Sequence, residues 1–381
     1  MAATRKAVSF GPNACPTFWV LGFSFTETIL GNERMNNADE CDVDVRVVGR
    51  AGRITLNRPN ALNALNGDMA VTIEVALDRW SSGNDVDLVV IDAVQDRAFC
   101  AGGDIAELYE RGLAGDFGFG RDFWRQEYRL NLMIAEYPKP VVAFMQGFTM
   151  GGGVGLGCHA SHRVVCENTQ IAMPECGIGL VPDVGGSMLL GKAPGQSGVY
   201  LGLTGSRMNA SDAIYAGFAD HFVPQEQWSA IKDALIEEGC TKSIVNAALV
   251  PTSGSLAANQ KAIDRLFAAQ TVARITRALE SDGSDFAQSA LRRLSKGAPL
   301  SLAAALRMIR SAADADIETA LRREYRFVYR SQERGDFNEG IRAQIIDKDQ
   351  NPAWRHKNND VPEADIRAML APLGPAEWNR T

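Results

Sequence analysis

The sequence predicts an α/β fold followed by an α-helical C-terminal region, and two observations lead to this prediction. Between residues 43 and 167, short apolar runs typical of strands alternate with longer segments whose apolar residues recur every three or four positions. Connections of this length join parallel strands through crossover helices. Beyond Gly186, helix-like segments follow one another with breakers between them, and only 221–223 resembles a strand.

The first elements are predicted to be a hairpin and a capped helix. Apolar and polar residues alternate from Val43 to Asn57 on both sides of a turn at 49–52, a pattern typical of two antiparallel strands. Asn66 stands where it can cap a helix over 69–80. Further strands are predicted over 86–94, 141–145 and 163–167, with helices over 117–137 and 152–160. The helices predicted in the second half are 210–218, 225–238, 259–268, 284–294, 300–312 and 317–330.

The composition is that of a globular protein with an acidic surface. Apolar residues make up 46% of the 381, enough for one large domain or two, and the net charge is −7 with a pI near 5.3. Such a chain is not expected to bind nucleic acid or an anionic membrane. Seven cysteines without CxxC spacing are typical of a reducing compartment. The four histidines include one HxxH pair but no further ligand set, so no metal site is expected.

The chain is predicted to have three parts. Residues 1–40 are expected to be a poorly ordered N-terminal extension, because the apolar patch 18–25 is too short to span a membrane and Met35 begins a segment that looks like a natural start. Residues 41–240 then form the α/β part and 241–381 the helical part. The most linker-like stretch is 251–255.

Glycine is concentrated in two turns that each follow a strand-like run. Residues 151–153 come after the strand at 141–145 and begin a helical pattern, and 99–104 follows the strand at 86–94. Amides at a helix N-terminus are unpaired, and glycine has no side chain to keep a ligand's oxygen from them. A glycine triplet alone also fits a flexible loop or close helix–strand packing. Two such turns can direct one amide each at a common point, which is an oxyanion hole.

Two carboxylates follow the second glycine turn. Glu175 stands among apolar residues in MPECGIG, and Asp183 lies eight residues later in VPDVGG. Apolar surroundings would raise the pKa of Glu175 and leave it reactive as a base or nucleophile. Each also has a structural interpretation: Glu175 could cap a short helix behind Pro174, and Asp183 could cap a helix that begins at Val184. Cys176 has no base near it in the sequence and is not expected to be a nucleophile.

Four motifs, in order, resemble the enoyl-CoA hydratase/isomerase (crotonase) superfamily and, more narrowly, its 3-hydroxyisobutyryl-CoA hydrolase branch. The resemblance extends from about Val43 to the C-terminal RSQERGDFNEGIRAQIIDKDQNPAW. It implies a crotonase-like spiral of ββα units followed by the helical C-terminal region. The motifs are LNRPNALNAL (56–65), RAFCAGGDI (97–105), KPVVAFMQGFTMGGGVGLG (139–157) and MPECGIGLVPDVGG (173–186).

The resemblance implies catalytic roles for residues in these motifs. Gly103 and Gly152 would supply the two oxyanion-hole amides, and Glu175 would be the catalytic glutamate. Hydratases carry a second glutamate two residues after the glycine triplet, where this chain has Gly155, and they carry glycine where it has Asp183. Hydration needs two carboxylates to place and deprotonate water. Both differences therefore favour hydrolysis of a thioester.

Further residues are implied to contact the substrate. Glu127 resembles an acidic residue that contacts the hydroxyacyl group in the hydrolases, and the alternative is a solvent-exposed glutamate on a helix face. Arg58 and Arg53 are candidates to contact the anionic coenzyme A (CoA). The positions that match the CoA channel of relatives are Ala61, Leu62, Ala64, Ala101, Gly103 and Asp104.

The function implied by the resemblance is hydrolysis of a 3-hydroxyacyl-CoA, with 3-hydroxyisobutyryl-CoA of valine catabolism expected first and 3-hydroxypropionyl-CoA second. Glu175 would attack the carbonyl or activate water, with Asp183 orienting it. The acyl-CoA is the substrate, so no cofactor is expected, and a homo-oligomer is possible. The cytoplasm is the expected compartment, with the mitochondrial matrix as the alternative. Alternative functions are an enoyl-CoA hydratase or isomerase and a non-catalytic CoA-binding relative.

Overall fold

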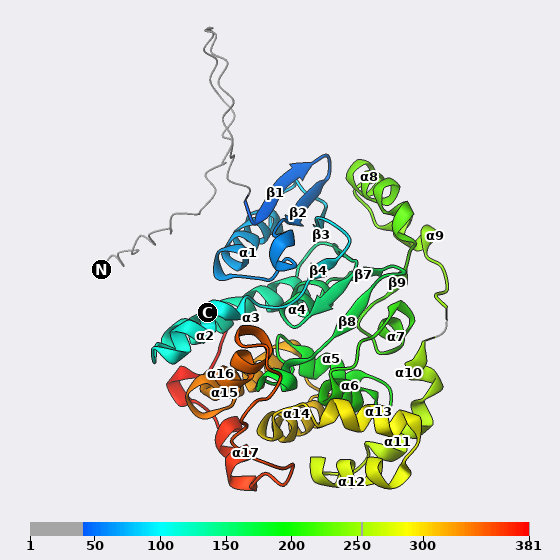
Figure 1. Ribbon diagram of the computed structural model, residues 1–381. Helices are drawn as coiled ribbons and strands as arrows, with labels where there is room; N and C mark the ends of the chain where they lie inside the picture. The colour runs from blue at the N-terminus through cyan, green and yellow to red at the C-terminus, as the bar shows by residue number, and fades with distance from the viewer. Residues whose placement is uncertain (1–40, 253, 381) are drawn as a thin grey trace, which may run out of the picture.

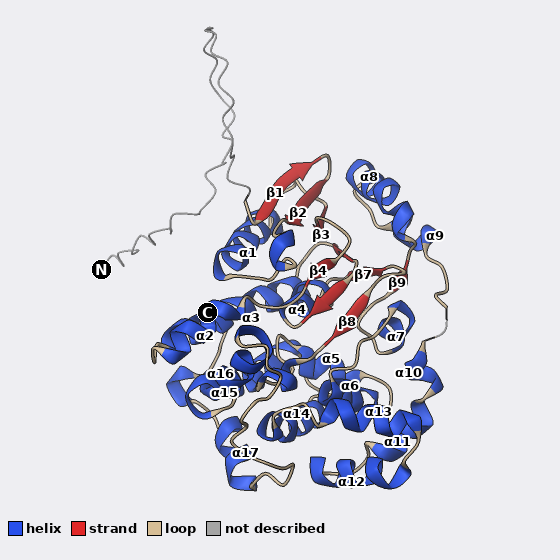
Figure 2. Cartoon of the chain, viewed as in Figure 1, coloured by secondary structure: helices blue, strands red, loops and turns tan. Residues whose placement is uncertain are grey.

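The computed structural model describes residues 41–252 and 254–380 (Figure 1). The expectations about residues 1–40, including the start at Met35, lie outside the described residues. Figure 2 shows the strands gathered in one half of the molecule and helices alone in the other half. Within the described ranges, no helix is both long enough and apolar enough to cross a membrane.

Two sheets form the α/β part of the chain. The larger sheet has the order β1-β2-β3-β5-β7-β9, in which only the β1–β2 pair is antiparallel. The smaller sheet has the order β4-β6-β8 and is parallel throughout. The strands of the larger sheet are β1 (Val43–Val48), β2 (Ala51–Leu56), β3 (Leu88–Ala93), β5 (Val141–Met145), β7 (His162–Val165) and β9 (His221–Phe222). Those of the smaller sheet are β4 (Ala98–Cys100), β6 (Phe148–Met150) and β8 (Gln170–Ala172).

The chain fills both sheets by winding as a spiral. Strand β3 is followed by β4, β5 by β6, and β7 by β8, so each turn of the spiral gives one strand to each sheet. The hairpin β1–β2 and the strands β3, β5 and β7 were predicted from the sequence, apart from their ends. The smaller sheet was not. Its strands have only three residues each, too short for alternation to be visible.

Helices connect the strands and cover the sheets. Asn66 caps α1 (Gly67–Ser81) as predicted, because its side chain accepts a 2.8 Å hydrogen bond from the Met69 amide. The predicted helix over 117–137 is α3 (Phe117–Ala135), and the one over 152–160 is the shorter α4 (Gly152–Gly157). The sequence did not predict α2 (Ile105–Leu113).

The rest of the chain is almost entirely helical. The predicted helices correspond to α7, α8, α11, α13, α14 and α15, whereas α5, α6, α9, α10, α12, α16 and α17 were not predicted. The boundary between the α/β part and the helical part, predicted at 240/241, stays a prediction. The bounds are α5 (Gly186–Lys192), α6 (Ser197–Thr204), α7 (Ala210–Tyr215), α8 (Trp228–Glu238), α9 (Lys242–Ala247), α10 (Ser255–Ala258), α11 (Gln260–Leu266), α12 (Val272–Asp282), α13 (Asp285–Leu294), α14 (Pro299–Ser311), α15 (Ile317–Arg334), α16 (Phe337–Ile341) and α17 (Glu363–Leu370).

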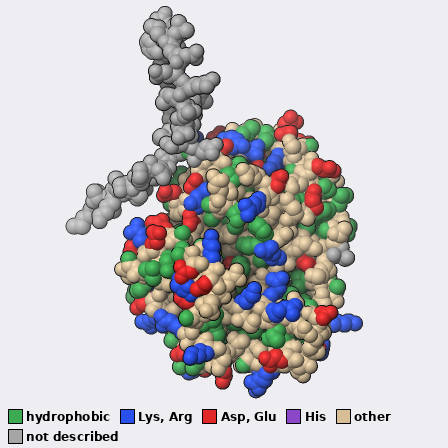
Figure 3. Space-filling model, in the orientation of Figure 1, with side chains coloured by type: hydrophobic (Ala, Val, Ile, Leu, Met, Phe, Trp, Pro, Cys, Tyr) green, Lys and Arg blue, Asp and Glu red, His purple; other side chains and the backbone are tan. Residues whose placement is uncertain are grey.

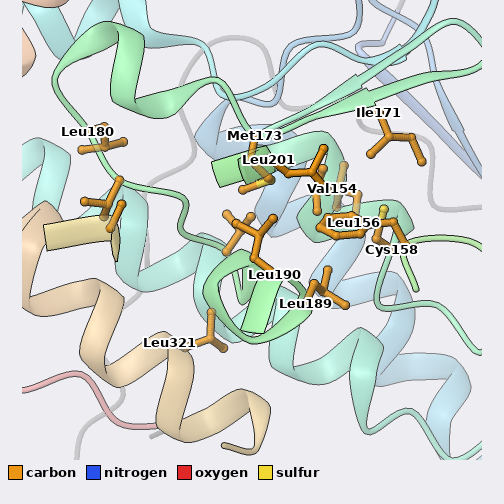
Figure 4. Close-up of a cluster of buried hydrophobic side chains, with 14 of the residues drawn as sticks. Val154, Leu156, Cys158, Ile171, Met173, Leu180, Leu189, Leu190, Leu201 and Leu321 are labelled. Carbon is orange, nitrogen blue, oxygen red and sulfur yellow. The ribbon is translucent and has the colours of Figure 1, made fainter. Parts of the chain in front are cut away.

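One continuous hydrophobic core joins the spiral to the C-terminal helices. Val154 and Leu156 of α4 belong to the same buried cluster as Leu190 of α5 and Leu321 of α15 (Figure 4). Helix α15 packs against both α3 and α5. Near the C-terminus, the fully buried Trp378 lies edge-on to Tyr128 of α3, with ring centroids 6.3 Å apart. The last residues of the chain therefore stabilise α3, the helix that precedes β5.

We expect Trp378→Ala to lower the free energy of unfolding by about 3–5 kcal/mol, because it removes a fully buried aromatic side chain and leaves a cavity beside Tyr128. The measurement is urea denaturation followed by fluorescence and circular dichroism. Val250→Ala is the control, since Val250 is 93% exposed and its truncation should change the free energy by less than about 0.5 kcal/mol. A loss below 1 kcal/mol for the tryptophan variant would contradict the docking of the C-terminal segment.

Candidate active site

The two glycine turns meet because the strands before them are neighbours. β4 pairs in parallel with β6, so the turns at their carboxyl ends lie at the same edge of the small sheet. Gly102 has φ +123° in the first turn, and Gly151 has φ +48° in the second, a backbone conformation that favours glycine. A Cβ atom built on Gly152 would lie 3.3 Å from the Gly103 nitrogen. The structure thus places the two predicted oxyanion-hole residues beside each other.

The amides of Gly103 and Gly152 are free to bind a ligand. Gly152 is the first residue of α4, where a helix has no internal acceptor for its N–H group. Neither amide donates a hydrogen bond to any of the described residues. Because the Gly102 carbonyl accepts a 2.8 Å hydrogen bond from the Leu65 amide, the first turn is held in place while the Gly103 amide remains unused. Two unpaired amides at one point are suited to bind an oxyanion.

Glu175 and Glu127 both point at the second glycine turn. A Cβ built on Gly151 would lie 2.9 Å from Glu175 Oε1, and one built on Gly152 would lie 2.5 Å from Glu127 Oε1. Both glutamates are buried, and Glu127 Oε1 and Glu175 Oε2 have no hydrogen-bond partner among the described residues. The alternative of an exposed Glu127 on a helix face is therefore wrong. Carboxylate oxygens without partners are available to a bound substrate.

Asp183 joins this group without capping a helix. Its Oδ2 accepts a 2.8 Å hydrogen bond from the Tyr128 hydroxyl, and the side chain is 4% exposed. Helix α5 begins at Gly186, two residues later than the alternative interpretation supposed, and no side chain caps it at the N-cap residue Gly185. Glu175 is likewise the first residue of a short 3-10 helix (Glu175–Ile178) whose N-cap residue is Pro174. Both capping interpretations are wrong.

Burial raises the pKa of every carboxyl in the group, and repulsion from Asp183 raises the pKa of the two glutamates further. Burial, and then the nearby Asp183, hold the pKa of Glu127 and that of Glu175 well above the usual glutamate value. Burial raises the pKa of Asp183 to about 7, while the hydrogen bond from Tyr128 acts in the opposite direction. Three neighbouring carboxyls in a dry site cannot all be ionised. Carboxyls with raised pKa values can take up and release protons in the course of a reaction.

Glu324 is a fourth buried carboxyl, which the sequence analysis missed. It extends from α15 and accepts hydrogen bonds from the Gly185 amide at 2.7 Å, the Ser187 amide at 2.9 Å and the Ser187 hydroxyl. Burial raises the pKa of Glu324 to about 8. A signal was present, since Glu324 falls on the apolar stripe formed by Leu321 and Val328, where a charged residue is unusual. The helical region thus holds the loop that carries Asp183.

His159 holds the same loop from the other side. Val184, next to Asp183, has φ +52°, which is strained for a β-branched residue. The Val184 carbonyl lies 2.7 Å from His159 Nε2, and burial lowers the pKa of His159 to about 4. The neutral ring therefore donates its Nε2 proton to the carbonyl. Together with Glu324, this bond stabilises a backbone conformation that the chain would otherwise avoid.

The turn at 61–64 lies against the first glycine turn, as the resemblance implied. The Leu62 carbonyl accepts a 3.0 Å hydrogen bond from the Ala101 amide. Arg58 lies 2.7 Å from Asp104 and also donates to the Ala64 carbonyl at 3.2 Å, so it is near these residues. The structure thereby brings together Arg58 and the predicted channel residues Ala61, Leu62, Ala64, Ala101 and Asp104.

Arg53 is placed differently from Arg58. It pairs with Asp92 at 2.5 Å, and Lys232 lies 2.7 Å from the same carboxylate. Arg53 is thus committed to an internal ion pair, and Arg58 remains the better candidate for a contact with CoA.

Basic and acidic side chains are interspersed on the face of the molecule drawn in Figure 3.

Cys176 is buried beside Glu175. Burial, followed by the charge of Glu175, raises the pKa of its thiol above the usual range. A protonated thiol is a poor nucleophile, in agreement with the sequence analysis. Among the residues that the structure describes, no three His, Cys, Asp or Glu side chains are grouped so that they could hold a metal ion.

Comparison with known proteins assigns the chain to a family. Residues 51–370 match the family model described as enoyl-CoA hydratase/isomerase, and the chain belongs to this family. A Xenopus tropicalis protein named 3-hydroxyisobutyryl-CoA hydrolase, mitochondrial, is 44% identical over 370 residues, covering 93% of this chain and 96% of that protein. The Homo sapiens protein of the same name is 36% identical over 372 residues, covering 93% and 95%.

Solved structures share the fold over nearly the whole described chain. The crystal structure of an enoyl-CoA hydratase from Rhodobacter sphaeroides 2.4.1 is 55% identical with a TM-score of 0.86, covering 89% of this chain and 99% of that chain. That of a carnitinyl-CoA dehydratase from Mycobacterium thermoresistibile is 40% identical with a TM-score of 0.85, covering 89% and 98%. The predicted crotonase-like fold with a helical C-terminal region is confirmed.

We expect Glu324→Gln to lower the free energy of unfolding by about 1–3 kcal/mol, because one of the acceptor oxygens facing the Gly185 and Ser187 amides becomes an NH₂ group. The measurement is urea denaturation at pH 7. Glu333→Gln on the same helix is the matched control, since its surface ion pair with Arg121 should contribute no more than about 1 kcal/mol. Equal effects of the two substitutions would show that Glu324 does not hold the Asp183 loop.

Proposed function

We propose that this protein hydrolyses a 3-hydroxyacyl-CoA thioester, namely 3-hydroxyisobutyryl-CoA, to 3-hydroxyisobutyrate and CoA. The observation that carries the proposal is the meeting of two free glycine amides with Glu175 and Asp183, at a site where Gly155 replaces a second catalytic carboxylate. The names of the 36–44% identical relatives support the same activity, which belongs to valine catabolism. 3-Hydroxypropionyl-CoA is the second candidate substrate.

The alternative is hydration, because similar solved structures are described as a hydratase and a dehydratase. The glycine at position 155 is evidence against hydration. Adding water across a double bond requires two carboxylates around that water, and this chain has no side chain at Gly155. A Cβ there would lie 2.5 Å from Asn131 Nδ2 and 3.0 Å from the Cβ of Val184, so these side chains fill the space that the second carboxylate would need. A purely CoA-binding role would leave the unpartnered Glu175 without a purpose.

The mechanism begins with the thioester oxygen accepting hydrogen bonds from the Gly103 and Gly152 amides. In one route, a Glu175 oxygen bonds to the thioester carbon, the C–S bond breaks and CoA leaves as the thiolate. Water then opens the mixed anhydride, and the proton released passes to the thiolate. In the other, Glu175 takes a proton from a water molecule, whose oxygen bonds to that carbon, and the C–S bond breaks so that the CoA thiolate leaves with that proton. Burial raises the pKa of Glu175, so its ionised form is a strong base and nucleophile. Single turnover in H₂¹⁸O separates the routes, because only the anhydride route labels Glu175.

Asp183 and Glu127 assist Glu175 in this proposal. Asp183, held by Tyr128, orients Glu175 or the water. Glu127 lies over Gly152 and accepts a hydrogen bond from the substrate's 3-hydroxyl. Arg58 and the turn at 61–64 contact CoA. No cofactor takes part, since CoA enters as part of the substrate and leaves as a product.

The compartment and assembly are also part of the proposal. The relatives' names include the word mitochondrial, which supports the matrix, our alternative, over the cytoplasm that we expected first. A homo-oligomer stays a proposal, and analytical ultracentrifugation of the purified protein tests it.

We expect Glu175→Gln to lower kcat for 3-hydroxyisobutyryl-CoA by at least about 10²–10³, because the amide can neither attack the carbonyl nor deprotonate water. Thiol release is measured with a disulfide reagent across a panel of acyl-CoAs that includes 3-hydroxypropionyl-CoA and an enoyl-CoA. Thiol release by the variant at near wild-type rate would exclude both routes. Loss of enoyl absorbance without thiol release in the wild type would instead establish a hydratase.

We expect Gly152→Ala to lower kcat by about 10²–10³, because its Cβ would lie 2.5 Å from Glu127 Oε1 and disturb the amide beside Gly103. Gly67→Ala is the matched control, since nothing lies within 4 Å of a Cβ there. Both variants are assayed for thiol release with the preferred acyl-CoA. Full activity of the Gly152 variant would remove this residue from the oxyanion hole.

A further inference from the structure

Asn131 is a buried amide with no hydrogen bond. It lies on α3 with 0% exposure, and neither its Oδ1 nor its Nδ2 has a partner among the described residues. An unsatisfied buried donor or acceptor costs about 1–3 kcal/mol. A side chain with both atoms unsatisfied requires an explanation, because most buried polar groups in proteins are paired.

The NH₂ groups of two other buried side-chain amides, Asn63 and Gln146, do have partners. Asn63 Nδ2 donates to the Ala98 carbonyl at 2.9 Å. Gln146 Nε2 donates to the Ala93 carbonyl at 3.1 Å and the Gln95 carbonyl at 2.8 Å. These two residues tie loops to the sheets and need no ligand. Asn131 makes no such connection, so a purely structural role does not explain why an amide is present there.

The position of Asn131 is that of the missing second carboxylate. A Cβ built on Gly155 would lie 2.5 Å from Asn131 Nδ2. Asn131 also lies one helical turn after Glu127 on the same face of α3, and Glu127 Oε1 lies over Gly152. The start of α4 is therefore lined in order by Glu175 at Gly151, Glu127 at Gly152 and Asn131 at Gly155.

The chemistry of the reaction indicates what an amide at this position would meet. In a hydratase, the two carboxylates hold the water that adds to C3 of the acyl chain, and the oxygen of that water becomes the 3-hydroxyl group. The 3-hydroxyl of a hydroxyacyl-CoA therefore belongs beside the position that Asn131 occupies. A hydroxyl group has one donor and can accept, and a carboxylate such as Glu127 satisfies only its donor. An amide NH₂ supplies the missing donor.

We propose that Asn131 Nδ2 donates a hydrogen bond to the substrate's 3-hydroxyl oxygen and makes the site selective for 3-hydroxyacyl thioesters over unsubstituted ones. This inference rests on the proposed function and adds a specificity-determining residue to it. An amide neither gives nor takes a proton near neutral pH, so it binds the hydroxyl without promoting loss of water. When the substrate lacks the hydroxyl, the buried amide stays unsatisfied, and this disfavours binding.

The test compares a hydroxylated substrate with its deoxy analogue. The values of kcat/KM for 3-hydroxyisobutyryl-CoA and isobutyryl-CoA are measured for the wild type, Asn131→Leu, Asn131→Ala and Gln146→Leu. One hydrogen bond in a buried site corresponds to about a tenfold preference. We expect the ratio of the two kcat/KM values to fall about tenfold or more in both Asn131 variants. The ratio should not change in Gln146→Leu, which removes a buried amide that is bonded to backbone carbonyls.

A structural role for Asn131 gives a different result. Activity toward both substrates would then fall by the same factor, the ratio would stay at its wild-type value, and the proposal would be overturned. Dissociation constants of 3-hydroxybutyryl-CoA and butyryl-CoA are measured by calorimetry on the same four proteins, so the inference is tested even if the wild type releases no thiol. An unchanged preference in both Asn131 variants contradicts the inference alone, whereas absence of thiol release in the wild type contradicts the proposed function.

Discussion

The parallel pairing of β4 with β6 is the constraint on which the site depends. Parallel strands end at the same edge of a sheet, so the turns after them are neighbours although they lie about fifty positions apart in the chain. The close approach leaves no room for side chains in the second turn, because a Cβ on Gly152 or Gly153 would press on Glu127 or on the Cys100 carbonyl. The packing itself therefore requires glycine at positions 152 and 153. Because glycine has no side chain, nothing of the residue itself covers the unpaired Gly152 amide.

The second feature of the site is the cost of burying charge. Glu127, Glu175 and Asp183 lie close together in a region that water does not reach, and their pKa values rise as a consequence. The folded protein bears this cost because other groups fix the geometry: Tyr128 donates to Asp183, and Glu324 and His159 hold the strained loop beside it. The strain at Val184 is thus stored next to a residue of the site.

The resemblance implies that hydratases and this protein share the two glycine turns and differ in what surrounds the acyl chain. A structure described as an enoyl-CoA hydratase is 55% identical to this chain, so the fold alone does not identify the reaction. The difference that the resemblance implies lies at positions 155 and 183, where this chain has glycine and aspartate. Asn131 and Val184 occupy the space beside Gly155, so the difference involves packing as well as charge.

The sequence by itself determined the larger sheet's main strands, the first capped helix, the family and a set of candidate site residues, because these depend on local patterns and on short sequence motifs. Only the tertiary structure decided the rest. The smaller sheet could not be predicted from the sequence, because strands of three residues show no periodicity. Yet the pairing within this sheet brings the two glycine turns together. Neither Glu324 nor Asn131 was singled out, since a polar residue within a helical segment can equally well face solvent. Their importance comes from burial against segments far away in the chain, and burial is a property of the packed molecule.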